Sequence, residues 1–168
     1  LRVAQIYETQ LEDVENAIGR YRRVAEVDAE NQNAIRALDR LFSMTERWQD
    51  LAAILAREAE IGQTPDEILD FRFRLGQLYE QRLSDVDNAI AAYREVISAA
   101  PEHTQTLEAL EALFAAGTKQ LEIGEILEPL YRAAGDGDKL AQVYEAQLVH
   151  TPAEKVGEHA GRQVAARE

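Results

Sequence analysis

The chain has 168 residues, of which 46% are hydrophobic, with a formal net charge of −13 and no cysteine. The length is enough to bury a core, while the negative charge argues against nucleic acid and anionic membranes as partners. The lack of cysteine rules out disulfide and thiolate chemistry and fits a reducing, cytoplasmic location. Since the longest apolar runs are too short to span a bilayer, we expect no membrane insertion.

Apolar residues recur at helical spacing along the chain, and no stretch alternates as a strand would. Leu1 is not a start methionine and residues 2–11 already have a helical pattern, so we expect a fragment of a longer protein that lacks its natural N-terminus. Thr64, Pro65 and Glu67 have the order of an N-cap, a first helical residue and a capping box. The pattern predicts ten helices, at residues 1–11, 13–28, 31–44, 47–61, 65–83, 85–99, 103–116, 119–134, 137–149 and 152–167.

The chain repeats itself. Aligning residues 1–42 with residues 73–114 gives 18 identical pairs out of 42 without a gap. Each half of this duplication divides again, because an aliphatic residue four positions before an aromatic one recurs as Val3/Tyr7, Leu38/Phe42, Leu75/Tyr79, Leu110/Phe114 and Leu140/Tyr144. Ten residues after the first four aromatics stand small residues, Ala17, Ala52, Ala89 and Gly124, as close helix crossings require.

The segment 72–101 carries this pattern most completely and resembles the tetratricopeptide repeat family. The matching residues, in the family's order, are Leu75, Gly76, Tyr79, Ala89, Tyr93 and Pro101. The resemblance implies an all-α fold: an α-solenoid, wound as a right-handed superhelix, of about five helix-turn-helix repeats. It divides a single domain, 1–168, into units at about 1–30, 31–63, 64–101, 102–135 and 136–168. Arg72 replaces the family's preferred Trp, and such departures also admit a divergent relative, such as a half-a-TPR-type repeat.

The resemblance further implies that the first helices of the units line a concave, ligand-binding face. The residues expected on that face are Gln5, Glu8, Arg36, Arg40, Phe73, Gln77, Glu80, Glu108, Gln142 and Glu145. Arg36 and Arg40 form its cationic spot. The family's clamp for chaperone C-termini needs Lys, Asn and Arg at positions where this chain has Gln and Glu, so we do not expect a chaperone-tail receptor.

No residue pattern indicates an enzyme, a cofactor or a metal site. The three histidines lack metal-ligand spacing, and the acids near Asp85 and Asp136 fit helix caps better than calcium loops. The carboxylate pairs Glu58/Glu60 and Glu122/Glu125 are interpreted as solvated helix faces, since a chain with 31 acidic residues produces such pairs by chance.

Two functions remain open at this point. The first is a non-catalytic scaffold that binds a peptide or partner protein on the concave face. The second is a structural spacer, or a self-association module that uses exposed repeat ends, within a larger repeat protein. The sequence does not identify the partner.

Overall fold

The computed structural model describes residues 13–150, which form eight consecutive α-helices and no strand. The all-α prediction is therefore confirmed, and the eight expected helices of this region end within two residues of their predicted positions. The expected first and tenth helices lie outside the described residues. The observed helices are α2 (Val14–Val27), α3 (Gln32–Met44), α4 (Trp48–Ile61), α5 (Pro65–Gln81), α6 (Val86–Ala99), α7 (Thr104–Ala115), α8 (Gln120–Ala134) and α9 (Gly137–His150).

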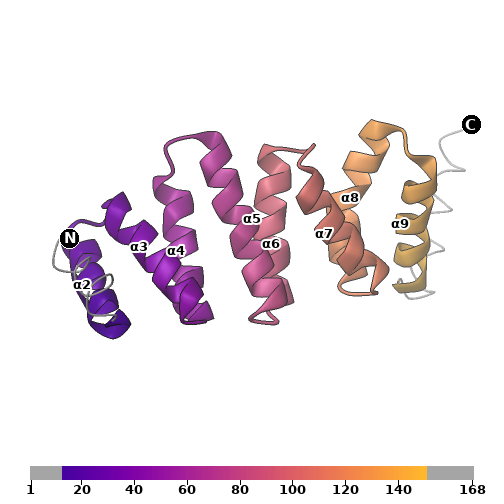
Figure 1. The fold of residues 1–168 in the computed structure, drawn as a ribbon. Helices are drawn as coiled ribbons and strands as arrows, with labels where there is room; N and C mark the ends of the chain where they lie inside the picture. The colour runs from indigo at the N-terminus through magenta and orange to yellow at the C-terminus, as the bar shows by residue number, and fades with distance from the viewer. Residues whose placement is uncertain (1–12, 151–168) are drawn as a thin grey trace, which may run out of the picture. The chain divides into compact units, whose positions relative to one another are not determined.

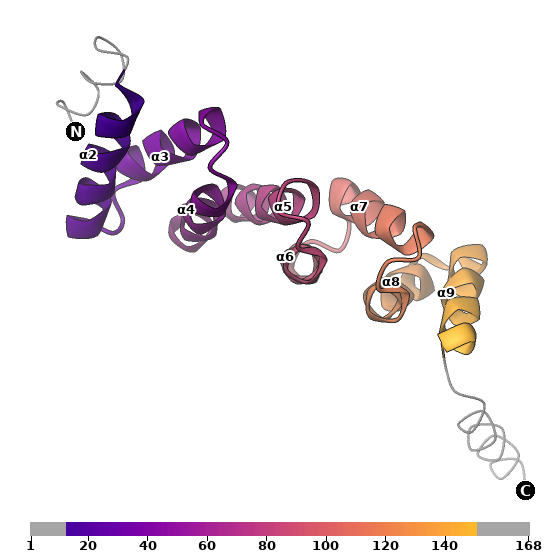
Figure 2. The same ribbon diagram turned by 90° about the horizontal axis from the view of Figure 1, so that it is seen from below.

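The chain divides into two compact units, residues 1–100 and 101–168. In the first unit each helix from α2 to α6 packs on the next one along the chain, and in the second unit α8 packs on both α7 and α9 (Figure 1). Within the first unit, α3 and α5 lie in one layer and α4 and α6 in the other (Figure 2). Such packing of sequence neighbours is the solenoid class of fold. The division into five repeat units stays a prediction.

The small residues at the predicted helix crossings are buried, as the sequence led us to expect. Ala17 and Ala89 have no exposed surface, and Ala52 and Gly124 are also buried. Gly124 faces Val143 of α9, whose methyl group lies 3.2 Å from the point that a β-carbon would occupy. These positions let the helix backbones approach closely, so a larger side chain there would force the helices apart.

Side-chain caps fix the helix starts that the sequence marked. The Thr64 hydroxyl accepts a hydrogen bond from the Glu67 backbone N–H at 3.2 Å, and the Glu67 carboxylate accepts one from the Gln63 backbone N–H at 3.1 Å. Asp85 accepts from the Asn88 N–H at the start of α6, at 3.2 Å. The prediction that this acid caps a helix is confirmed.

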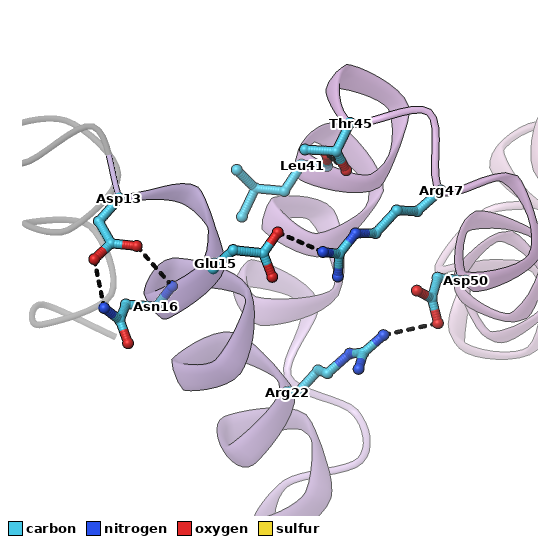
Figure 3. Close-up of polar contacts among 8 residues, drawn as sticks. All are labelled: Asp13, Glu15, Asn16, Arg22, Leu41, Thr45, Arg47 and Asp50. Atoms are coloured by element: carbon cyan, nitrogen blue, oxygen red, sulfur yellow. Dashed lines mark hydrogen bonds and ion pairs between the residues drawn. The ribbon is translucent and has the colours of Figure 1, made fainter.

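Polar contacts also tie α2 to α4 and to the turn before α4 (Figure 3). Arg22 pairs with Asp50 at 2.7 Å, and Arg47 pairs with Glu15. All four side chains are substantially exposed to water, so each pair adds at most about 1 kcal/mol and chiefly sets the relative position of the helices. None of the helices between residues 13 and 150 combines the length and apolar character that crossing a bilayer requires.

Candidate functional site

A line of charged residues joins α3 to α5, two of the helices expected to carry ligand-binding positions in the first unit. The Arg74 guanidinium donates two hydrogen bonds to the Asp39 carboxylate, at 2.8 and 3.0 Å. Closer to the start of both helices, Arg36 lies 3.6 Å from Glu67 in a looser pair. The bidentate geometry makes Asp39–Arg74 the stronger and more directional link of the two.

Glu58 of α4 is buried at this junction, with only 3% of its surface exposed. Neither of its carboxylate oxygens accepts a hydrogen bond from the described residues. Burial, and then the negative charge of Asp39, raise the pKa of Glu58 from 4.5 to about 7, while Arg74 and Arg36 act in the opposite direction. A hydrogen bond that the neutral Glu58 carboxyl donates to the Asp39 carboxylate raises this pKa further.

The expectation that Glu58 belongs to a solvated helix face is therefore wrong. Its partner in that pair, Glu60, is exposed as expected. The signal for burial was present in the helical phase, because Glu58 follows Ile54 by four residues and Leu55 by three, and both of those side chains are buried. The acidic composition of the chain hid this signal.

A small pocket lies beside Glu58, enclosed by residues of α3, α4 and α5. Its lining residues are Gln32, Ile35, Arg36, Glu58, Ile61, Gly62, Glu67 and Phe71. The free volume is about 10 Å³, enough for one water molecule. The pocket thus combines apolar walls, one loose ion pair and one buried carboxyl group whose oxygens accept no hydrogen bond from the described residues.

A wider and more open groove, with a free volume of about 350 Å³, lies against α7 and α9 in the second unit. Two residues expected on the ligand-binding face, Gln142 and Glu145 of α9, line this groove. Phe114 and Val149 contribute apolar surface to it, and Val149 is 81% exposed. The structure therefore brings two expected site residues together in this groove.

The remaining expected site residues have different environments. Arg36, Arg40 and Glu108 are exposed, and Arg36 and Arg40 are one helical turn apart on α3. Gln77 is half-buried. Gln5 and Glu8 lie outside the described residues.

Phe73 does not face solvent, so its expected outward placement is wrong. It is 9% exposed, and its ring lies 5.9 Å from that of Tyr93, centroid to centroid. The physical reason is the helical phase, since Phe73 precedes Gly76 by three residues and Gly76 is the point where α5 meets the Tyr93 ring. Phe73 is thus part of the packing between α5 and α6.

Glu80 is half-buried and already has a structural partner. The Tyr93 hydroxyl donates to its carboxylate at 2.6 Å. Burial raises the pKa of Tyr93, and the acceptor Glu80 raises it further, so the phenol keeps its proton at any physiological pH. Glu80 therefore helps to hold the two helices of its repeat together.

Within the part of the chain that the structure describes, no cluster of three or more His, Asp or Glu side chains is arranged to hold a metal ion. His103, one of the three histidines, serves instead as the N-cap of α7 and accepts a hydrogen bond from the Thr106 backbone N–H at 3.3 Å.

Residues 69–103 match the model of the tetratricopeptide repeat family. The matched segment contains most of α5 and all of α6, the helices joined by Gly76 and Tyr93. Residues 69–103 are therefore similar to a tetratricopeptide repeat. Together with the eight consecutive helices, the match fits a tetratricopeptide-like repeat array. Such repeats generally mediate protein–protein interaction and have no catalytic role of their own. No curated protein matches the sequence.

Proposed function

We propose that the chain is a non-catalytic scaffold that binds a peptide or a partner protein on the face formed by the first helices of its repeats. The observation that carries the proposal is the tetratricopeptide repeat at residues 69–103, set among helices that pack in sequence order. Stacked helical repeats create extended concave binding surfaces, and we expect the first helices of the repeats to line such a surface here.

Each compact unit offers polar residues and a hollow on its own first helices. In the first unit, α3 carries the exposed Arg36 and Arg40, and Arg36 also lines the pocket beside Glu58. In the second unit, Gln142 and Glu145 line the groove against α7 and α9. A mixed surface of this type suits a polypeptide ligand that has both charged and apolar side chains.

The proposal is tested by reversing charge on one helix and comparing the outcome with a matched change elsewhere. The test variant is Arg36→Glu/Arg40→Glu on α3, and the control is Arg20→Glu/Arg23→Glu on α2, which changes the net charge equally at two exposed positions. Proteins captured from a lysate by the wild type are quantified for each variant. We expect the α3 variant alone to capture at least tenfold less partner protein than the wild type. Equal capture of partner protein by the wild type and both variants would contradict the proposal.

One observation favours the alternative of self-association. Leu148 and Val149 of α9 are 64% and 81% exposed, an unusual placement for two adjacent large apolar residues. Sedimentation velocity of the wild type and of Leu148→Glu/Val149→Glu separates the two functions. Self-association would be favoured by two results together. The wild type would form a dimer that the substitutions dissociate, and the α3 charge reversal would not change the capture of partners.

A further inference from the structure

The groove of the second unit has apolar surface from both α7 and α9. Phe114 and Ala115 of α7 line it, as do Ala146 and Val149 of α9. Val149 is 81% exposed, and Ala115 is exposed as well. The free volume of about 350 Å³ falls within the range of about 300–1,000 Å³ that is usual for ligand pockets. The groove therefore has room for a large side chain and offers apolar surface that such a side chain can cover.

The polar lining of the groove restricts what can accompany that side chain. The Gln120 amide already donates to the Phe114 backbone carbonyl at 3.0 Å. Glu145 is exposed, and its carboxylate has no hydrogen-bond or ion-pair partner among residues 13–150. It follows Gln142 by three residues, so both side chains lie on neighbouring positions of α9. An ionised carboxylate only accepts hydrogen bonds, so a cationic donor complements Glu145 best.

The charge of the second unit favours the same class of ligand. Residues 101–150 contain nine acidic and three basic residues. Two of the three basic residues are paired within the unit, Arg132 with Glu128 and Lys139 with Glu111. This excess of acid attracts basic segments and repels acidic ones. A second copy of the chain, with a net charge of −13, is for the same reason a poor occupant of the groove.

We propose that this groove binds a basic segment of a protein partner, with a large apolar side chain against Phe114 and Val149 and an arginine or lysine paired with Glu145. The inference rests on the proposed function, because it assumes a polypeptide ligand on the first helices of the repeats, and it adds the chemical class of the partner. Covering the apolar surface supplies affinity. The charge pair selects basic segments over acidic ones.

The first experiment determines the chemistry of the occupant without assuming its sequence. A phage-displayed library of random linear peptides is selected on the full chain and, in parallel, on Glu145→Arg. We expect the wild type to enrich peptides in which Arg or Lys stands close to a large apolar residue, and Glu145→Arg not to enrich them. The control is Glu125→Arg on α8, which changes the net charge equally at an exposed position outside the groove and should enrich the same peptides.

Calorimetric titration with the most enriched peptide then locates the contact. Glu145→Arg should weaken binding about tenfold, because attraction becomes repulsion. Val149→Ser should weaken it about fivefold through the loss of apolar surface. The control is Leu148→Ser, since Leu148 is 64% exposed and does not line the groove, and its affinity should stay within about twofold of the wild type.

The pairing with Glu145 is tested by changing the peptide as well. Replacing the basic residue of the peptide by glutamine should weaken binding to the wild type. The same replacement should leave binding to Glu145→Gln unchanged, because the ion pair can be lost only once. Losses that simply add would show that the basic residue does not contact Glu145.

Three results would each overturn the proposal: enriched peptides without basic residues, equal affinities of Val149→Ser and Leu148→Ser, or no enrichment above background. The last result would mean that the groove is closed to a partner, either by residues 151–168 or by a second copy of the chain.

The two proposals fail in different ways. If Arg36→Glu/Arg40→Glu loses its lysate partners while selection on the wild type enriches no basic peptide, the scaffold stands and this occupant is removed. If the peptides bind the groove as described and no lysate partner depends on α3, the groove stands and the proposed role of α3 is removed.

Discussion

The ring of Tyr93 lies 2.4 Å from the point that a β-carbon on Gly76 would occupy. Tyr93 is completely buried, and its hydroxyl is held by Glu80, so the ring has no room to move away. Gly76 on α5 and Tyr93 on α6 are thus in close contact across the two helices of the matched repeat. The glycine of the repeat pattern is required here by a neighbouring side chain.

Gly76→Ala should destabilise the protein by about 1–3 kcal/mol, since the added methyl group overpacks the site against a fixed ring. The matched control is Gly19→Ala on α2, where nothing lies within 4 Å of the new β-carbon. Alanine there should stabilise by about 0.5–1 kcal/mol through its better helix propensity. Urea unfolding of both variants checks the pair, and a gain in stability for both would refute the packing account.

Much of this fold could be predicted from the sequence because it depends on local signals. Helical periodicity, the Thr64-Pro65 start and the small residues at Ala17 and Ala89 each follow from short-range rules. Phe73 and Glu58 could not be placed correctly by the same reasoning, because composition and repeat position favoured an exposed side chain at each. Their burial depends on contact with another helix. In the sequence, this contact is indicated by their spacing of three or four residues from buried positions on the same helix.

The site was less predictable than the fold for a related reason. The pocket beside Glu58 depends on the way side chains from three helices leave a gap, and no single segment encodes such a gap. The sequence did single out Arg36, which lines this pocket, and it singled out Gln142 and Glu145, which line the groove in the second unit. It gave no indication of the link between Asp39 and Arg74.

Glu58 should make the stability of the protein depend on pH. Its pKa is about 7 in the folded state and 4.5 when unperturbed, so between these values the folded chain binds the proton that the unfolded chain has lost. The free energy of unfolding contributed by this group is therefore highest below pH 4.5 and falls by about 1.4 kcal/mol per pH unit until about pH 7.

Glu58→Gln should remove this dependence and, at pH 8, be more stable than the wild type by about 1–3 kcal/mol, because an uncharged amide is less costly to bury than a carboxylate. Denaturant unfolding from pH 4.5 to pH 8 measures the effect. Glu60→Gln serves as the control and should keep the wild-type slope. A wild type whose stability does not fall across this range would show that Glu58 is not buried as described.

Asp39→Asn should lower the pKa of Glu58 toward its usual value of 4.5. The substitution removes the negative charge that raises this pKa, and it releases Arg74, whose positive charge lowers it. Loss of the bidentate pair should also destabilise the protein by about 1 kcal/mol, since Arg74 is partly exposed. NMR titration of the Glu58 carboxyl carbon measures this pKa directly. A higher pKa of Glu58 in Asp39→Asn than in the wild type would contradict this electrostatic arrangement.

The central claim is that partners bind to the first helices of the repeats, and site-specific photo-crosslinking tests it most directly. A photoreactive residue is placed at Arg40 on α3 or, as the control, at Arg23 on α2; both positions are exposed and lie in the same compact unit. After irradiation in lysate, adducts are counted by mass spectrometry. The account predicts a discrete partner adduct from position 40 that is absent from position 23. Adducts from position 23 alone would contradict it.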